Sequence, residues 1–158
     1  MRLKPTKAKV VGRARLMRLR ASWKRRRKTV VFTNGVYDIL HPGHVSLLEK
    51  AGNLGHVLIV GVNSDASARR LGKSGPKRPV NALKDRMRVL AALECVDAVS
   101  AFSEDTPEAL LARLRPDVLV KGADYKVEDV AGRAFAKRTV LIPLKKGYST
   151  THILKRID

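Results

Sequence analysis

Residues 29–44 read TVVFTNGVYDILHPGH, an apolar, β-branched run followed by the start of a helix. Such a run is typical of a parallel strand buried on both faces, and ligands bind at the carboxyl ends of these strands. Pro42 suits the first helical turn because its missing N–H would have no partner there. Gly43 lets a ligand approach the backbone closely. Since a helix start attracts anions, the stretch predicts a phosphate site between strand and helix.

Two histidines flank this helix start. His41 and His44 are three positions apart, so we expect both rings to project to the same side and to donate to one phosphate. The alternatives are two surface histidines or half of a metal site. A metal needs at least a third ligand, and His56 and His152 have no local ligand spacing. We therefore favour the phosphate site and expect no metal held by the protein itself.

Strand and helix patterns alternate along the chain, and they predict an α/β fold. Short apolar runs rich in β-branched residues predict strands over 29–33, 56–62, 98–101, 117–121 and 139–143. The segments between and after them predict helices over 43–54, 65–71, 82–93, 107–114 and 150–157. Strands joined by crossover helices give a doubly wound five-stranded parallel sheet with right-handed crossovers.

Charge divides the 158-residue chain in two. Thirteen of the 33 Lys and Arg residues lie in 1–28, and the first acidic residue is Asp38, so most of the net charge of +19 belongs to this leader. We expect a partly helical basic leader over 1–28 and a single domain over 29–158. Within the leader, apolar residues recur at helical spacing and favour a helix that covers one face of the domain. Binding of nucleic acid or of an anionic membrane through 25–28 is the less favoured interpretation.

The sequence also indicates the cellular compartment in which the protein is expected to function. No apolar run approaches the ~18 residues of a membrane span, and the basic N-terminus lacks a small-residue cleavage site. A single cysteine, Cys95, excludes an internal disulfide and fits a reducing environment. We therefore expect a cytoplasmic protein without a membrane span.

Two motifs together resemble a known family. The His-Pro-Gly-His of 41–44 and the Lys-Gly-Tyr-Ser-Thr-Thr of 146–151 are similar to the two signatures of the cytidylyltransferase-like nucleotidyltransferases. Further stretches resemble its heptose 1-phosphate adenylyltransferase branch; these are 62–65, 78–81 with 85–86, 120–126 and 147–151. The resemblance implies a Rossmann-like nucleotidyltransferase fold with strand order 3-2-1-4-5, commonly as a homodimer.

The same resemblance implies a reaction. AMP passes from ATP, bound with Mg²⁺, to a heptose 1-phosphate, giving pyrophosphate and ADP-heptose for surface polysaccharide (lipopolysaccharide). A separate kinase is then expected to supply the sugar phosphate. One alternative is a cytidylyltransferase acting on a small alcohol phosphate such as glycerol 3-phosphate or phosphocholine. Others are a nucleotide sensor without turnover and a nucleic-acid-binding protein that acts through its leader.

Residue roles follow from the motifs and the resemblance. The expected catalytic residues are His41, His44 and, on a loop that can close over the site, Lys73. The expected nucleotide-binding residues are Thr33, Asn34, Gly35, Asp38, Gly43, Lys121, Gly122, Tyr148, Ser149, Thr150 and Thr151. The expected acceptor-binding residues are Asp65, Arg86 and Asp124. Four of these have a structural alternative: Asp38 orients backbone N–H groups, Asp65 or Ser149 caps a helix, and Arg86 forms a salt bridge.

Overall fold

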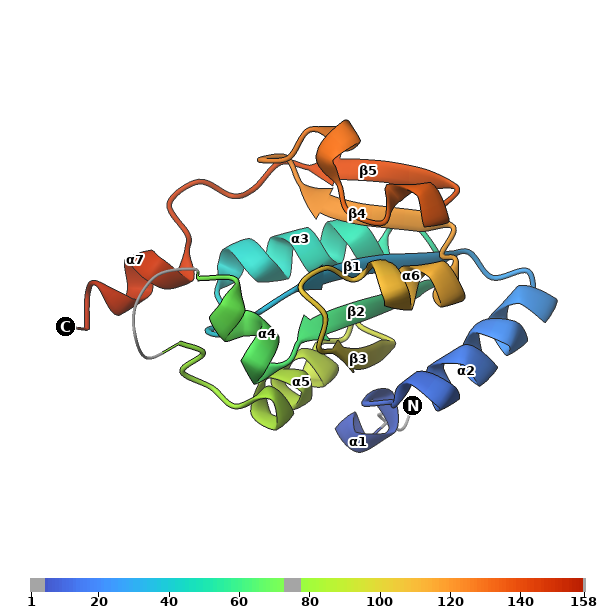
Figure 1. Cartoon of the computed structure of the whole chain (residues 1–158), viewed down its shortest axis with the longest axis horizontal. Helices are drawn as coiled ribbons and strands as arrows, with labels where there is room; N and C mark the ends of the chain where they lie inside the picture. Colours follow the sequence, from blue (N-terminus) through green and yellow to red (C-terminus); the bar gives the residue numbers. More distant parts are fainter. Residues whose placement is uncertain (1–4, 73–77, 158) are drawn as a thin grey trace.

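The computed structural model describes residues 5–72 and 78–157. It contains one five-stranded sheet, in which every paired strand is parallel and the order is β3-β2-β1-β4-β5 (Figure 1). The strands are β1 (Val30–Gly35), β2 (Val57–Asn63), β3 (Ala98–Phe102), β4 (Val118–Gly122) and β5 (Arg138–Ile142). This confirms the predicted fold class and strand order.

Helices cover both faces of the sheet. They are α1 (Thr6–Lys9), α2 (Arg13–Arg25), α3 (Pro42–Gly52), α4 (Asp65–Arg70), α5 (Leu83–Ala92), α6 (Glu108–Leu114) and α7 (Thr150–Leu154). Two 3₁₀ turns, η1 (Val127–Asp129) and η2 (Arg133–Phe135), follow β4. Neighbouring residues of β1 serve opposite faces: Val31 packs with α3 and α5, whereas Val30 and Phe32 pack with α2 and α6. Alternation of this kind explains why the consecutive residues 30–32 are all apolar.

The leader is part of the packed molecule. Leu16 is fully buried, and Leu19 and Trp23 pack beside it against α6, as their spacing predicted. Ahead of α2, the backbone N–H of Val11 donates to the carbonyl of Val99 on the edge strand β3 at 2.9 Å. The basic segment thus covers one face of the domain and contacts the edge strand β3 at one bridge.

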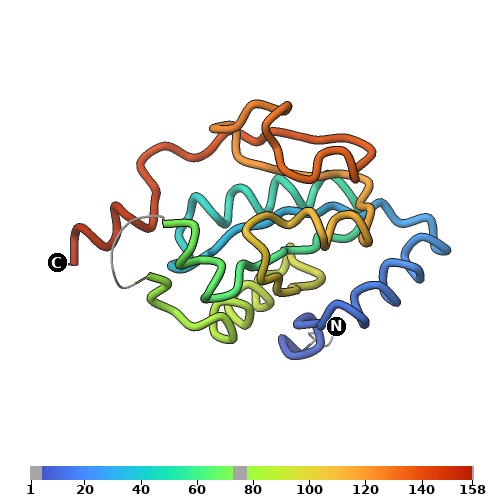
Figure 2. Tube along the Cα trace, viewed as in Figure 1, coloured from blue at the N-terminus to red at the C-terminus, as the bar shows by residue number. Residues whose placement is uncertain are grey.

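The last helix is shorter than predicted. The sequence predicts a helix over 150–157, but α7 ends at Leu154. Ile157 is 74% exposed, so the final turn has no apolar contact to hold it in the helix. The connection from β5 carries α7 to the segment after β1 (Figure 2), where the Thr150 hydroxyl donates to the carbonyl of Ile39 at 3.3 Å.

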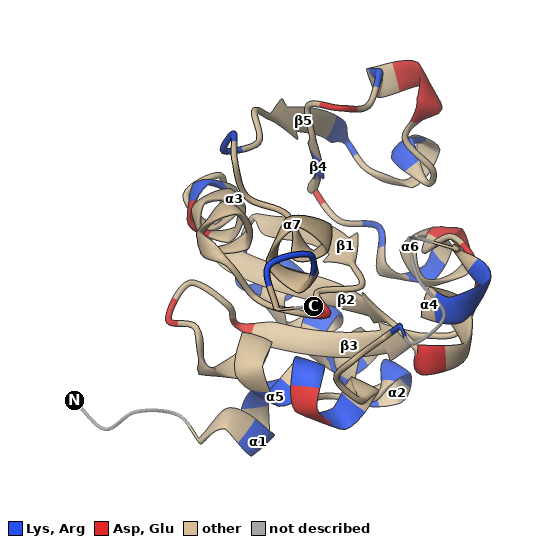
Figure 3. Ribbon diagram, turned by 90° about the vertical axis from the view of Figure 1, so that its left-hand side faces the viewer, with Lys and Arg blue, Asp and Glu red and all other residues tan. Residues whose placement is uncertain are grey.

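All five strands run in one direction, so their carboxyl ends lie at one edge of the sheet. Figure 3 views the molecule from this edge, with α7 in front of β1. In the parts of the chain that the structure describes, no helix is both long and apolar enough to cross a bilayer. The carboxyl edge is where the predicted site residues gather.

Candidate active site

A cavity of about 520 Å³ opens at the carboxyl edge of the sheet. It brings together residues from the ends of β1 and β4, the start of α3 and the start of α7. The predicted residues that line it are Thr33, Asn34, Gly35, Asp38, His41, Gly43, His44, Lys121, Gly122, Asp124, Tyr148, Ser149, Thr150 and Thr151. Segments more than 100 residues apart in the sequence therefore line one cavity.

His41 and His44 lie ring against ring at the start of α3. Their centroids are 3.8 Å apart, with 20° between the ring planes. His41 is the N-cap residue of α3, and its Nδ1 accepts from the backbone N–H of His44 at 3.4 Å. An accepting Nδ1 places the proton of the neutral ring on Nε2. His41 can therefore offer an Nε2–H donor to a phosphate.

Both rings are held neutral. Burial, and secondarily the neighbouring His41, lower the pKa of His44 from 6.5 to about 4, and burial lowers the pKa of His41 as well. The pair then acts through hydrogen bonds rather than through two positive charges. The buried Nδ1 of His44 and Oδ1 of Asn34 have no hydrogen-bond partner among the described residues. Orphaned polar atoms are rare in folded proteins, and two of them in one cavity indicate a ligand site.

Close packing fixes the helix start. A Cβ on Gly43 would lie 3.0 Å from the His41 ring and 3.2 Å from the Cβ of Tyr148, so a larger residue would require these neighbours to shift. Behind His44, the buried Tyr37 ring packs edge-on with its centroid 5.1 Å away. Tyr37 has a positive φ of 50°, a strained conformation for an aromatic residue. We did not predict Tyr37 from sequence, because an aromatic residue in a turn carries no distinct signal.

Asp38 holds a distant segment against the site. Its carboxylate, which is fully buried, accepts from the backbone N–H groups of Val80 and Asn81 at 3.0 and 2.9 Å and from Nε of Arg78 at 3.1 Å. The expectation that Asp38 orients backbone N–H groups is confirmed. Its contacts join the turn after β1 to the segment that leads into α5.

Asp65 and Arg86 do not line the cavity but contact each other. Nη2 of Arg86 lies 2.7 Å from the Asp65 carboxylate, and the buried guanidinium also donates to the carbonyls of Val36, Asn63 and Asn81. Burial raises the pKa of Asp65. The hydrogen bond from Arg86, together with a backbone hydrogen bond and nearby cations, lowers it by more, so the net pKa is lowered. The cap alternative for Asp65 is wrong, because Ser64 caps α4. The salt-bridge alternative for Arg86 is confirmed, and acceptor contact by either residue stays a prediction.

The hydroxyls of Ser149 and Thr150 at the start of α7 have structural partners. Ser149 Oγ accepts from the backbone N–H of His152 at 3.0 Å, so Ser149 is the helix cap, and Thr150 donates to Ile39. Lys73, the third expected catalytic residue, lies outside the described residues.

The family can now be identified from comparison with known proteins. Residues 32–156 match the sequence profile of the Cytidylyltransferase-like family. The chain belongs to this family. One cytidylyltransferase-like relative, the D-beta-D-heptose 1-phosphate adenylyltransferase of Bordetella bronchiseptica, is 49% identical over 154 residues, which cover 95% of this chain and 94% of that protein.

Longer relatives contain the same unit. The bifunctional protein HldE of Helicobacter pylori (strain Shi470) is 56% identical over 128 residues, 81% of this chain, but the match covers only 27% of HldE. The chain therefore spans less than a third of that relative. Among solved structures, the lipopolysaccharide core biosynthesis protein of Thermoplasma volcanium matches with a TM-score of 0.65 and 26% identity, covering 75% of this chain and 99% of that one.

The cavity of this cytidylyltransferase-like domain contains residues that we did not predict. Residues 105–107, between β3 and α6, contribute to its wall, as does Lys145, whose Nζ lies 5.1 Å from the centre of the Tyr148 ring. A position just after a strand is the only sequence signal that could have indicated 105–107. Within the described residues, no three His, Cys, Asp or Glu side chains are grouped to hold a metal ion.

Proposed function

We propose that this chain is an adenylyltransferase that transfers AMP from ATP to a heptose 1-phosphate, releasing pyrophosphate and forming ADP-heptose. The observation that carries the proposal is the stacked, neutral His41–His44 pair at a helix start inside a cavity at the carboxyl edge of the sheet. The choice of sugar is supported by the Bordetella relative, which matches this chain over nearly the full length of both proteins. We expect the enzyme to act in the cytoplasm, where its product would serve lipopolysaccharide synthesis.

The proposed reaction needs alignment more than it needs a base. A phosphate oxygen of the sugar phosphate, already an anion, attacks the α-phosphorus of ATP as the bond from that phosphorus to the pyrophosphate oxygen breaks. Charge then builds on the α-phosphate and on the leaving group. Nε2–H of His41 and the ring of His44 would donate to the α-phosphate. Such pre-oriented donors stabilise a transition state most effectively where water is excluded.

The strand ends suggest how the substrates lie. The backbone at the end of β1, Thr33 to Gly35, would follow the triphosphate, and the start of α7 would supply further N–H donors. Lys121 and Gly122, at the end of the adjacent β4, would face the base and ribose. Asp124, in the loop after β4, would contact the ribose or the sugar phosphate. Contact of Asp65 and Arg86 with the acceptor remains to be tested.

Magnesium would enter with the nucleotide. Because the described residues group no carboxylates for a metal, the phosphate oxygens and water would provide its ligands. Bound in this way, Mg²⁺ offsets negative charge on the phosphates. Lys73 would contribute a positive charge from the protein that offsets the same negative charge on the phosphates.

Pyrophosphate release tests the proposal. ATP and CTP are each paired with heptose 1-phosphate, glycerol 3-phosphate and phosphocholine in the presence of Mg²⁺. Release with ATP and heptose 1-phosphate alone is the expected result. Release with CTP and a small alcohol phosphate would overturn the assignment of base and acceptor, and no release from any pair would favour a nucleotide sensor.

A further inference from the structure

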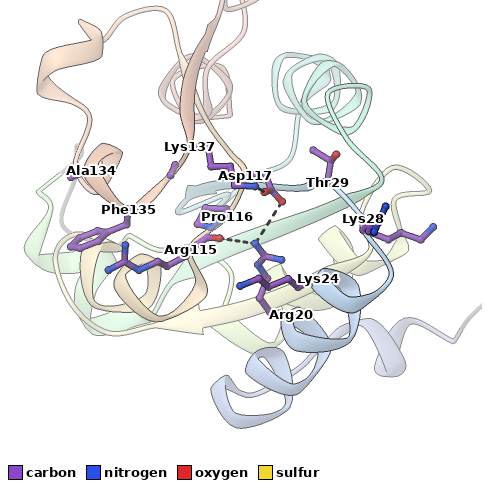
Figure 4. Close-up of a pocket in the computed structure, with 12 residues that line it drawn as sticks. Arg20, Lys24, Lys28, Thr29, Arg115, Pro116, Asp117, Ala134, Phe135 and Lys137 are labelled. Atoms are coloured by element: carbon purple, nitrogen blue, oxygen red, sulfur yellow. Dashed lines mark hydrogen bonds and ion pairs between the residues drawn. The ribbon is translucent and has the colours of Figure 1, made fainter.

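A second cavity lies at the opposite edge of the sheet, where β1, β4 and β5 begin. It has a volume of about 560 Å³ and is bordered by the end of α2, the connection from α6 to β4, and the segment from η2 to β5 (Figure 4). We call it the basic cleft. Its charged or aromatic lining residues are Arg20, Lys24, Arg27, Lys28, Arg115, Asp117, Phe135 and Lys137.

Asp117 neutralises only part of this charge. Its carboxylate lies 2.6 Å from Nζ of Lys137 and 3.6 Å from Nη2 of Arg20, and it accepts from the backbone N–H of Val30 at 2.9 Å. Burial raises the pKa of Asp117, but the Lys137 and Val30 hydrogen bonds and the nearby cations outweigh it, so the pKa is lowered and the group stays ionised. The carboxylate of Asp117 therefore forms ion pairs with two cations of the cleft, Arg20 and Lys137.

The remaining cations lie at its rim. The side chains of Lys24, Arg27 and Lys28 have no hydrogen bond or ion pair with any residue that the structure describes. Arg115 lies over the Phe135 ring, with its guanidinium carbon 5.8 Å from the ring centre. Two cations in the last turn of α2 would satisfy the helix dipole, yet all five residues 24–28 are basic. The excess charge is therefore available to an external polyanion.

We propose that the basic cleft binds single-stranded nucleic acid, with its phosphates on Lys24, Arg27 and Lys28 and a base beside Phe135. Cations that follow a backbone, next to an aromatic ring on which a base can stack, are typical of single-strand binding sites. The helical spacing of apolar residues in the leader favours a structural role for it. The apolar side chains of α2 fulfil that role by packing against the domain, and these three cations have no partner among the residues that the structure describes.

Two other ligands fit less well. A membrane-bound helix needs exposed apolar side chains to insert, but Leu16, Leu19 and Trp23 are already packed against the domain. A small phosphorylated ligand would be held by buried polar groups. Here Lys24 and Arg27, which have no partner among the described residues, are exposed at the rim, and 25–26 between them are basic and exposed as well. An extended polyanion matches this distribution of charge.

Fluorescence anisotropy of the full-length chain with a labelled oligothymidylate of about 20 nucleotides tests the proposal. The variant Lys24→Ala/Arg27→Ala/Lys28→Ala removes three rim cations. The control Lys50→Ala/Lys84→Ala/Arg88→Ala removes the same charge from exposed positions on α3 and α5. Thermal unfolding of both variants verifies the fold.

We expect the cleft variant to bind at least about tenfold more weakly at low salt. The slope of log affinity against log salt should become shallower by about 2, since each lost single-strand contact removes about 0.7. The control should retain most of the affinity and the slope. Phe135→Leu should weaken binding with an unchanged slope, because it removes stacking and no charge.

Three results would overturn the proposal. Equal weakening in both triple variants would mean that binding follows net charge alone. Tighter cleft-dependent binding of inorganic tripolyphosphate than of the oligonucleotide would assign the cleft to a small ligand. Cleft-dependent binding of phosphatidylserine vesicles without oligonucleotide binding would assign it to a membrane surface.

Discussion

The rings of His41 and His44 stack at a centroid distance of 3.8 Å, and the Nδ1 of the first accepts from the backbone N–H of the second. Two imidazolium ions could not stack at this distance without strong repulsion, so the arrangement requires at least one neutral ring. The lowered pKa values of both residues meet this requirement. The helix cap, the stacking and the charge state are therefore three consequences of one placement.

Replacing His44 should abolish most of the turnover and preserve the fold. His44→Ala removes a donor proposed to stabilise the transition state, and we expect turnover to fall by ~10²-fold or more. Steady-state pyrophosphate release measures this. His56→Ala is the matched control, because His56 precedes β2 at the other edge of the sheet and should retain activity. Near-normal turnover in His44→Ala would remove the proposed role.

Acid should destabilise the protein through His44. The unfolded chain protonates this ring near pH 6.5, whereas the folded protein protonates it only near pH 4. Between these values the unfolded state binds more protons, so the free energy of unfolding falls as the pH falls, by about 2 kcal/mol at pH 5. Urea unfolding at pH 7, 6 and 5 measures the loss. In His44→Asn this contribution should vanish; the same decline in the variant would contradict the assignment.

Asp38 should be needed to join the turn after β1 to the segment before α5. Asp38→Asn removes the charge and turns an amide N–H₂ toward backbone donors, and we expect a loss of about 2–4 kcal/mol in stability. Chemical denaturation measures it. Asp85→Asn, an exposed site on α5, is the control and should change stability by less than about 0.5 kcal/mol. Equal effects at the two sites would show that the buried contacts of Asp38 contribute nothing.

Leu16 should stabilise the whole domain although it lies in the leader. Its side chain is fully buried against α6, so Leu16→Ala should cost about 2–5 kcal/mol of unfolding free energy. A single cooperative unfolding transition, shifted to lower denaturant, is expected. Arg25→Ala, an exposed neighbour on α2, should leave the transition in place. A leader that unfolds in a separate, earlier transition would show that it is not part of the domain.

Local patterns determined much of this protein. The apolar run 29–33 predicted a strand buried on both faces, and His-Pro-Gly-His predicted a helix start suited to phosphate, because strand burial and helix capping depend on residues close in sequence. Similar apolar runs sufficed for the five strands, and these patterns together with the family resemblance predicted half of the residues that line the cavity. The resemblance to a known family supplied the strand order.

Tertiary structure alone decided which partner each charged residue has. No local sequence pattern shows that Asp38 accepts hydrogen bonds from residues 78–81, or that Arg86 donates to carbonyls on three segments. Nor does one show that Asp117 forms ion pairs with both Arg20 and Lys137. With 33 cations for 14 carboxylates, each acid has many candidate partners, and only the folded chain brings particular ones within hydrogen-bonding distance. The same holds for the basic cleft: the sequence showed the charge of the leader, but the packing of α2 decided which cations remain exposed.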